Sequence, residues 1–421
     1  MNTLILPRIL NKSRISNNYI YQLILECETV EVIFVPLTTN RVNGYILTNL
    51  SDPILITPTK QWSEISNYDK VLYLKNLNDY QNIEECIDKD FIWLKHPLLN
   101  QEYTLTEINN SWENSLTLKK ENRERGIKGL RRPQIGAIYA TLGHWEVSNE
   151  TATLVMPTGT GKTETMLSLL LMGNIEKLLV IVPTDALRKQ VSDKFIDFGI
   201  LHKVLELLNE NTLYPKVGVL KSKLSTSEEI EEFFNRSNVI ISTAQIVTGM
   251  LLDLQQCIAN KCSHLFIDEA HHVGATTWKS FKKEFSSKKI LQFTATPFRN
   301  DNKSLDGKII FNYPLSKAQD EGYFREIEFI PIKEFDSNKY DKSIADKAVE
   351  ILRRDLESGY NHVLMARVNS KKRAEEVFEC YVEFEEFNPI QIHTGINQTE
   401  RKSIKESIEK LETKIIICVD M

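Results

Sequence analysis

The sequence has few cysteines, no long uncharged apolar run and no excess of positive charge. Its six cysteines are scattered, and only Cys257 and Cys262 lie close together, without a second pair or a histidine at zinc-ligand spacing. We therefore expect reduced thiols and no zinc site. No uncharged apolar stretch approaches the roughly 18 residues of a membrane span, and the N-terminus lacks the features of a signal peptide. These absences favour a cytoplasmic protein without a membrane anchor.

The net charge is −5 and the isoelectric point is near 6.0, which excludes a histone-like polycation but still permits a basic groove. A chain of 421 residues with 42% hydrophobic and 26% charged residues is globular and long enough for two or three domains. Residues 119–132 carry seven Lys or Arg against two Glu, a local charge of +5. We interpret this segment as a solvated linker, with a phosphate-binding arm as the alternative.

Residues 1–118 contain no motif with evident chemistry. Alternating apolar and polar residues at 30–35 and 45–50, with Asn-Gly and Asp-Pro turns, predict a small β-rich or α+β domain. A nuclease-like Glu-x-Lys after an acidic strand is missing from this region. The role of this part is therefore left open.

Residues 153–163, TLVMPTGTGKT, predict a buried strand, a glycine-bearing turn and the start of a helix. Such a loop binds phosphate because its N–H groups and the helix dipole point at one anion. Lys162 would reach the β- and γ-phosphates, and the Thr163 hydroxyl would hold Mg²⁺. Met156 stands where the strict phosphate-loop pattern has glycine. A turn with an incidental lysine is the alternative.

The segment FIDEAHH at residues 266–272 is an apolar strand that ends in two carboxylates, 106 residues after the phosphate-loop lysine. Strands and helices alternate around it, which predicts a parallel sheet that gathers ligands at its carboxyl edge. Asp268 can hold the Mg²⁺ shell, and Glu269 can deprotonate water, since a strand end aims neighbouring side chains apart. A metal cluster of Asp268, His271 and His272 is the disfavoured alternative, because HExxH spacing is absent.

Five segments in this order resemble the motifs of superfamily 2 helicases and translocases. They are MPTGTGKT at 156–163, VPTDALRKQ at 182–190, ISTAQ at 241–245, IDEAH at 267–271 and FTATPFRND at 293–301. The resemblance covers the chain from about residue 130 onward. It is greatest to the DEAD/DEAH-type branch of restriction-enzyme motor subunits and DNA repair helicases. It implies RecA-like α/β lobes that clamp ATP and Mg²⁺ and move along nucleic acid.

The resemblance also implies roles for individual residues. Gln134, 28 residues before Lys162 and just after Pro133, corresponds to the glutamine that reads adenine; its amide can donate and accept. The phosphate loop corresponds to Pro157, Thr158, Gly159, Thr160, Gly161, Lys162 and Thr163. The metal, catalytic and coupling residues correspond to Asp268, Glu269, His271, Thr294 and Thr296. Contacts to the nucleic-acid backbone correspond to Thr184, Arg188, Ser242 and Thr243, with helix N-caps at the two threonines as the alternative.

The expected fold is α/β in three parts. They are a small N-terminal domain at residues 1–118, a RecA-like ATP-binding lobe at 119–333 and an incomplete second RecA-like lobe at 334–421. The sequence stops at IIICVDM, before the arginine-bearing block that the resemblance implies. We therefore expect a C-terminally truncated chain that binds ATP and hydrolyses it poorly on its own.

The expected function is an ATP-dependent helicase or translocase that acts on DNA rather than RNA, by analogy with the restriction-enzyme branch. Partner subunits of a restriction or defence system are a further expectation. The alternative is a nucleotide-gated nucleic-acid-binding or scaffold subunit without processive hydrolysis.

Overall fold

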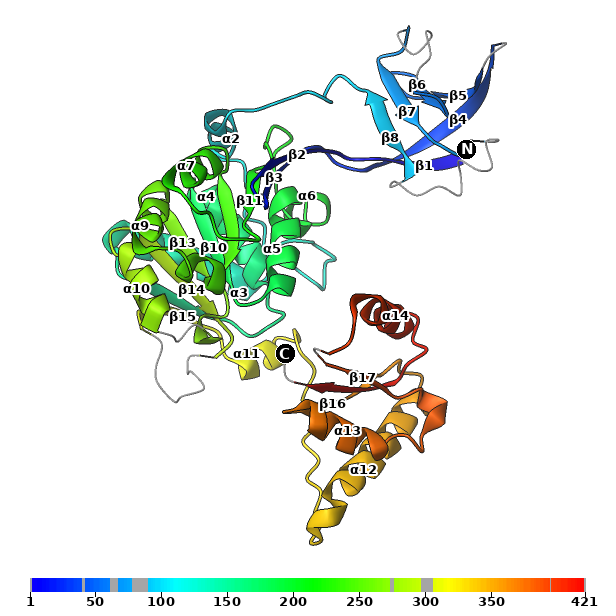
Figure 1. Cartoon of the computed structure of the whole chain (residues 1–421), viewed down its shortest axis with the longest axis vertical. Helices are drawn as coiled ribbons and strands as arrows, with labels where there is room; N and C mark the ends of the chain where they lie inside the picture. Colours follow the sequence, from blue (N-terminus) through cyan, green and yellow to red (C-terminus); the bar gives the residue numbers. More distant parts are fainter. Residues whose placement is uncertain are drawn as a thin grey trace. The chain divides into compact units, whose positions relative to one another are not determined.

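The computed structural model describes residues 2–39, 42–60, 67–77, 90–272, 276–296, 306–393 and 395–419 (Figure 1). Cys86 and residues 297–301 of the fifth motif lie outside these ranges. The chain divides into two compact units, Met1–Arg325 and Glu326–Met421. The domain limits drawn from the sequence at residues 118 and 333 stay predictions. Among the described residues, none of the helices has the length and hydropathy needed to cross a membrane.

A nine-stranded sheet forms the centre of the first unit, in the order β15-β9-β14-β13-β10-β12-β11-β3-β2. Its parallel strands are β9 (Ala152–Val155), β10 (Leu178–Val182), β11 (Lys216–Val219), β12 (Val239–Thr243), β13 (His264–Ile267), β14 (Lys289–Thr294) and β15 (Lys308–Asn312). Strands such as β10, LLVIV, are buried at every position, as expected where helices cover both faces of a parallel sheet.

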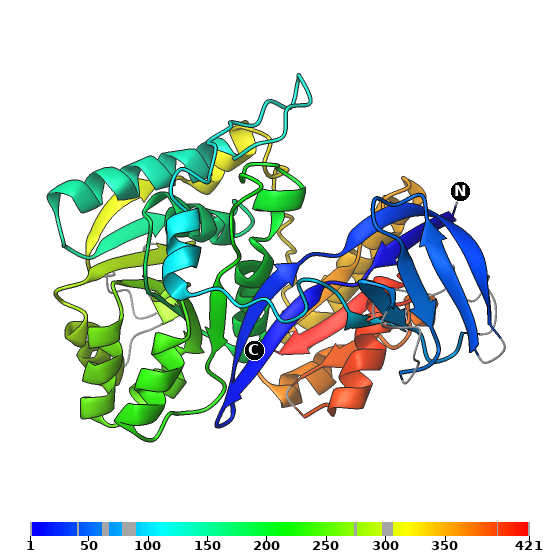
Figure 2. The ribbon, with the colours of Figure 1, turned by 90° about the horizontal axis from the view of Figure 1, so that it is seen from above.

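Helices pack on both faces of this sheet (Figure 2). They are α3 (Arg132–Val147), α4 (Lys162–Met172), α5 (Asp185–Asp197), α6 (Ile200–Lys203), α7 (Ser227–Asn235), α8 (Ala244–Thr248), α9 (Leu252–Lys261) and α10 (Thr276–Glu284), and α11 (Leu315–Asp320) follows β15. Leu170 of α4 and Phe195 of α5 belong to one core cluster, whereas Phe233 of α7 and Phe281 of α10 belong to the other. This three-layer α/β arrangement is the predicted RecA-like lobe.

A second sheet in the first unit has the order β1-β4-β5-β6-β7-β8. Its strands are β1 (Asn2–Leu6), β4 (Glu28–Thr39), β5 (Val42–Thr48), β6 (Ile54–Thr57), β7 (Lys70–Tyr73) and β8 (Ile92–Lys95), and α2 (Leu105–Ser111) follows them. Leu4, Val32 and Trp93 contribute to the core of this sheet. It confirms the β-rich character predicted for the N-terminal region.

The β2–β3 hairpin belongs instead to the nine-stranded sheet. Strand β3 (Asn18–Leu25) pairs antiparallel with β11 in the register Val219↔Tyr19, and β2 (Ile9–Ile15) forms the outer edge. This pairing was not anticipated from the sequence, because its partners lie about 200 residues apart and leave no local signal. The hairpin turn consequently lies at the carboxyl edge of β11.

The second unit contains a three-stranded parallel sheet in the order β16-β18-β17. Its elements are α12 (Tyr340–Glu357), β16 (Leu364–Val368), α13 (Lys371–Glu379), β17 (Ile390–Ile392), α14 (Gln398–Glu409) and β18 (Ile415–Val419). Val349, Val377 and Ile417 form part of its core. Its strands and helices alternate, as expected of a second α/β lobe.

Candidate nucleotide site

The predicted phosphate loop lies between β9 and α4 at the carboxyl edge of the nine-stranded sheet. Gly159 and Gly161 have φ values of +85° and +94°, which side chains other than glycine rarely adopt. Gly161 is the N-cap of α4, and the Thr160 hydroxyl donates to Pro157 O at 2.6 Å. Left-handed glycines before a helix N-terminus let loop N–H groups turn toward one anion, although Thr160 N here donates to Pro157 O at 3.2 Å.

Lys162 lies at the start of α4 and is 9% exposed. Its ammonium forms an ion pair with the Glu269 carboxylate, which follows β13. The two residues are 107 positions apart in the chain, so the fold alone brings them together. The structure therefore places the predicted phosphate-binding lysine and the predicted catalytic base in direct contact.

Asp268 and Glu269 diverge through a backbone turn rather than through strand alternation. Strand β13 ends at Ile267, and Glu269 has a φ of +47°, in the left-handed region that is costly for a residue with a side chain. The Asp268 N–H donates to Ile181 O at 2.8 Å, and the Glu269 N–H donates to Asp268 Oδ1 at 3.0 Å. Our expectation that alternation along a strand aims the two carboxylates was wrong, because the strand ends before them.

Asp268 is 6% exposed, and burial raises its pKa to about 6. The nearby Lys162 charge opposes this effect, whereas the Glu269 carboxylate adds to it. The side chain is therefore poised to lose its proton near neutral pH. A nearby divalent cation would favour the ionised form further.

Replacing Asp268 with asparagine should stabilise the fold at alkaline pH. The pKa of Asp268 is higher in the folded chain than its usual value near 3.9, so stability is lost as the pH rises from about 4 through 6. We expect Asp268→Asn to raise the free energy of unfolding by about 2 kcal/mol at pH 8 and by far less at pH 4. Urea unfolding of both proteins at the two pH values measures this, and an equal gain at both would contradict a charge-based cause.

A chain of polar contacts links Glu269 to the end of β14. His271 Nδ1 lies 3.4 Å from Glu269 Oε2 and 3.0 Å from Thr294 Oγ1. The Thr294 hydroxyl donates to Thr296 O at 2.6 Å, and Met156 N donates to Thr294 O at 2.8 Å. The predicted coupling residues therefore form one network with the predicted base and the strand before the phosphate loop.

Gln134 packs directly on the phosphate loop. It is 3% exposed, its Oε1 accepts from Arg131 N at 2.7 Å, and its Nε2 donates to Gly161 O at 3.3 Å. Sequence reasoning missed Arg131, whose guanidinium donates to Gly159 O at 2.8 Å and lies over the Tyr323 ring. The two arginines directly before Pro133, inside the basic segment, were the sequence feature that could have indicated a contact with the phosphate loop.

The four predicted nucleic-acid contacts lie at neighbouring strand ends, because Val182 of β10 pairs with Thr243 of β12. The Thr184 hydroxyl accepts from Leu187 N, so Thr184 is an N-cap of α5, which was the alternative to a nucleic-acid contact. The Thr243 side chain forms no such capping bond. Ser242 is buried and donates to Thr243 O at 3.2 Å. Arg188 is 7% exposed, and its Nη1 lies 2.9 Å from Asp185 Oδ1 without hydrogen-bond geometry. Their role in binding nucleic acid stays a prediction.

The residues of this site fit a nucleoside triphosphate and Mg²⁺. A Cβ added at Gly161 would lie 2.0 Å from Gln134 Nε2, so the backbone must be bare at the point where the loop meets the helix. A buried lysine, two carboxylates and the half-buried Thr163 converge on the same edge. This donor set combines a cation for phosphate with the hard oxygen ligands that Mg²⁺ prefers.

The sheet, the glycine loop and the paired carboxylates define a RecA-like lobe of the phosphate-loop class. Residues 127–299 match the family described as "Type III restriction enzyme, res subunit", over a span that includes the loop and both carboxylates. The match confirms the resemblance to superfamily 2 helicases that the ordered motifs predicted. This part of the chain therefore resembles the ATP-binding lobe of superfamily 2 helicases and translocases.

Three solved structures show a distant likeness, and no curated protein sequence matches the chain. A hypothetical ATP-dependent RNA helicase from Sulfolobus tokodaii is 17% identical over 75% of this chain and 82% of its own, with a TM-score of 0.32. The Pyrococcus furiosus Hef helicase domain is 14% identical over 67% and 85%, with a TM-score of 0.40. Mycobacterium smegmatis helicase Lhr, bound to ssDNA and AMP-PNP, is 14% identical over 68% and 39%, with a TM-score of 0.44. Because all three TM-scores lie below 0.5, the family match carries the assignment.

Proposed function

We propose that this protein is a motor that couples ATP hydrolysis to movement along nucleic acid, with DNA favoured over RNA. The contact of Lys162 with Glu269, beside the buried Asp268, is the observation that carries the proposal. It joins a phosphate-binding cation, a metal ligand and a base at one sheet edge. The preference for DNA rests on the restriction-enzyme family matched by residues 127–299.

In this proposal the loop N–H groups and Lys162 hold the phosphates, while Thr163 and Asp268 hold Mg²⁺. The metal would supply charge neutralisation for phosphoryl transfer to water. Lys162 would exchange its Glu269 partner for phosphate oxygens, which frees the Glu269 carboxylate to take a proton from water. Gln134, which contacts Gly161, would report adenine binding to the same loop.

The network from Glu269 through His271 to Thr294 would carry the state of the site to the end of β14. Hydrogen-bonded side chains with alternative partners are the elements through which such coupling travels. Because Met156 N bonds Thr294 O, a shift of Thr294 would also reach the strand that enters the phosphate loop.

Replacing Lys162 with alanine should abolish nucleotide binding. The variant removes the lysine in contact with Glu269 and leaves two carboxylates facing a triphosphate. We expect the affinity for a fluorescent ATP analogue to fall by at least about 100-fold, since a charged hydrogen bond contributes roughly 1.5 to 3 kcal/mol and repulsion adds to its loss. Lys279→Ala, at an exposed position on α10, is the matched control.

The motor activity itself is tested by ATP hydrolysis with single-stranded DNA, duplex DNA or RNA added to the protein. Stimulation by DNA above that by RNA supports the proposal. Hydrolysis that no nucleic acid stimulates would contradict it and would favour the nucleotide-gated binding subunit.

A further inference from the structure

One face of the β2–β3 hairpin carries cations around tyrosine rings. Lys12 Nζ lies 4.3 Å from the centroid of the Tyr19 ring, Lys221 Nζ lies 5.0 Å from it, and Arg14 Cζ lies 5.9 Å from it. The Tyr21 ring is 6.1 Å from the Tyr19 ring and 5.7 Å from Lys12 Nζ. We call these five residues the hairpin platform.

The hairpin platform is held in place by its own turn and by the loop after β11. Asn18 is fully buried, and its Oδ1 accepts from Lys221 N at 2.7 Å and from Ser222 N at 3.0 Å. The Arg14 guanidinium donates to Ser16 O at 2.5 Å and to Asn17 Oδ1 at 2.8 Å. The cations therefore project from an anchored sheet edge, which lowers the cost of ordering them on a ligand.

The cations of the hairpin platform are not held in ion pairs within the described part of the chain. None of Lys12, Arg14 and Lys221 forms an ion pair with a carboxylate among the described residues. Lys12 and Lys221 are both exposed to solvent. Like charges gathered around one ring repel each other. A polyanion lying across the platform would remove this repulsion.

The hairpin platform adjoins α5, the helix that starts at the predicted backbone contacts. Tyr21 and Lys221 line a cavity of about 400 Å³ together with Arg188 and Lys189 of α5. Asp185, Asp193 and Asp197 line the same cavity, so phosphates are better placed along the rim than inside it. The register Val219↔Tyr19 puts Tyr19 near the carboxyl edge that also carries the phosphate loop.

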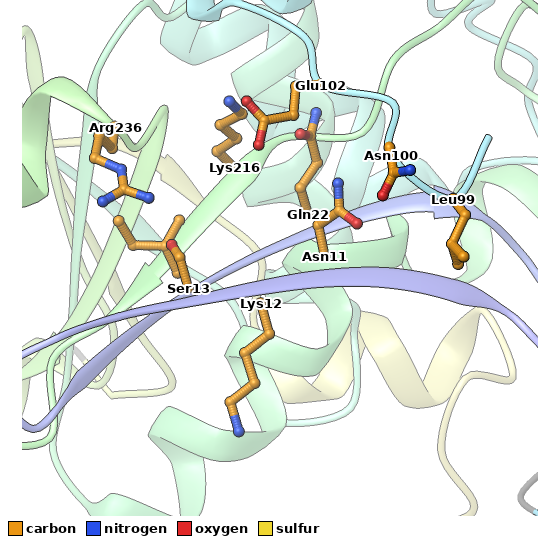
Figure 3. A pocket seen from close by; sticks show the side chains of 10 residues that line it. Asn11, Lys12, Ser13, Gln22, Leu99, Asn100, Glu102, Lys216 and Arg236 are labelled. Carbon is orange, nitrogen blue, oxygen red and sulfur yellow. The ribbon is translucent and has the colours of Figure 1, made fainter. Parts of the chain in front are cut away.

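The opposite face of the hairpin has a different character. A cavity of about 350 Å³ lies there, lined by Asn11, Gln22 and Lys12. The Lys12 side chain is directed away from those of Asn11 and Gln22 (Figure 3). Lys216 and Arg236 in this cavity are accompanied by Glu102, and Arg236 is paired with Glu232. Arg236 of this cavity is ion-paired, whereas the platform cations form no ion pair among the described residues.

We propose that the hairpin platform is a second nucleic-acid site, which grips a single strand as it leaves the carboxyl edge of the nine-stranded sheet. Lys12, Arg14 and Lys221 would contact backbone phosphates, and Tyr19 would offer a ring on which an unpaired base stacks. Basic side chains interleaved with aromatic rings bind single strands without reading sequence. This inference rests on the proposed function and adds to it a surface outside the five motifs.

The test measures binding of labelled oligothymidine to the whole chain by fluorescence anisotropy, as a function of salt. In Lys12→Ala/Lys221→Ala, two phosphate contacts are lost, and each contributes about 0.7 to the salt slope for a single strand. We expect the slope to fall by about 1.4 and the Kd to rise roughly 10- to 30-fold near 0.1 M salt. Arg14 stays unchanged in this variant because it supports the turn.

The matched control is Lys279→Ala/Lys308→Ala, which removes the same charge from exposed positions on α10 and on β15 at the far edge of the sheet. Its Kd should stay within about twofold of the wild-type value, because long-range charge is screened at this salt. Tyr19→Ala should weaken binding roughly 5- to 100-fold through lost stacking, whereas Tyr19→Phe should not.

Three results would overturn the inference. If the lysine double variant binds like its control while DNA still stimulates hydrolysis, the hairpin platform is not a nucleic-acid site, but the proposed motor function is retained. If duplex DNA binds more tightly and Tyr19→Ala has no effect, the single-strand contact is wrong. If the wild-type chain binds neither DNA nor RNA, the platform and the proposed function fail together.

Discussion

Replacing Glu269 with glutamine should leave nucleotide binding within about threefold of the wild-type value and lower ATP turnover by roughly 10²- to 10⁴-fold, the usual contribution of a general base. Glutamine keeps the size and the hydrogen-bonding oxygen of Glu269 but cannot take a proton from water. The loss should therefore appear in kcat and not in nucleotide affinity. Steady-state hydrolysis and titration with a fluorescent ATP analogue separate the two.

The control for this variant is Glu176→Gln, a change of the same chemistry at an exposed loop position before β10. It should leave turnover unaltered. Retention of wild-type turnover by Glu269→Gln would remove Glu269 from the role of base. A loss of affinity equal to the loss of turnover would show instead that the Lys162 contact organises the loop.

Replacing Gly161 with alanine should weaken nucleotide binding by roughly 10- to 100-fold. Alanine at a φ of +94° is strained by about 1 to 3 kcal/mol, and its Cβ would lie 2.0 Å from Gln134 Nε2. The loop must then move, and its N–H groups no longer converge. The double variant Gly161→Ala/Gln134→Ala should remove the clash and keep the strain, so it should recover only part of the affinity.

Gly143→Ala is the matched control, because Gly143 lies within α3 and an added Cβ would have no atom within 4 Å. This change should raise the free energy of unfolding by about 0.5 to 1 kcal/mol through helix propensity. Nucleotide affinity should not change. Wild-type affinity in Gly161→Ala would mean that the ligand does not use this loop.

The central strands could be predicted because their signals are local. The apolar run at residues 178–182 is too short for a helix and is bounded by turn residues, and it forms β10 at those positions. The apolar residues before Asp268 were likewise expected to form a strand, and they belong to β13. Motif order was enough to bring Lys162 and Asp268 to one sheet edge, since carboxyl ends of parallel strands share that edge.

What the sequence could not reveal are contacts that depend on distant partners or on backbone turns. The pairing of Tyr19 with Val219 spans about 200 residues, and nothing near Tyr19 specifies it. The left-handed turn at Glu269 breaks the strand alternation from which its direction was inferred. Arg131 sits in a segment interpreted as a linker, and only the folded chain shows its bond to Gly159 O.

The most direct measurement is a crystal structure of the protein with a non-hydrolysable ATP analogue and Mg²⁺. Our account predicts that the β- and γ-phosphates lie on the N–H groups of residues 159–163, with the Lys162 ammonium moved from Glu269 to a phosphate oxygen. It also predicts Mg²⁺ between Thr163 and Asp268. An analogue bound elsewhere, or bound while the Lys162–Glu269 ion pair stays intact, would contradict it.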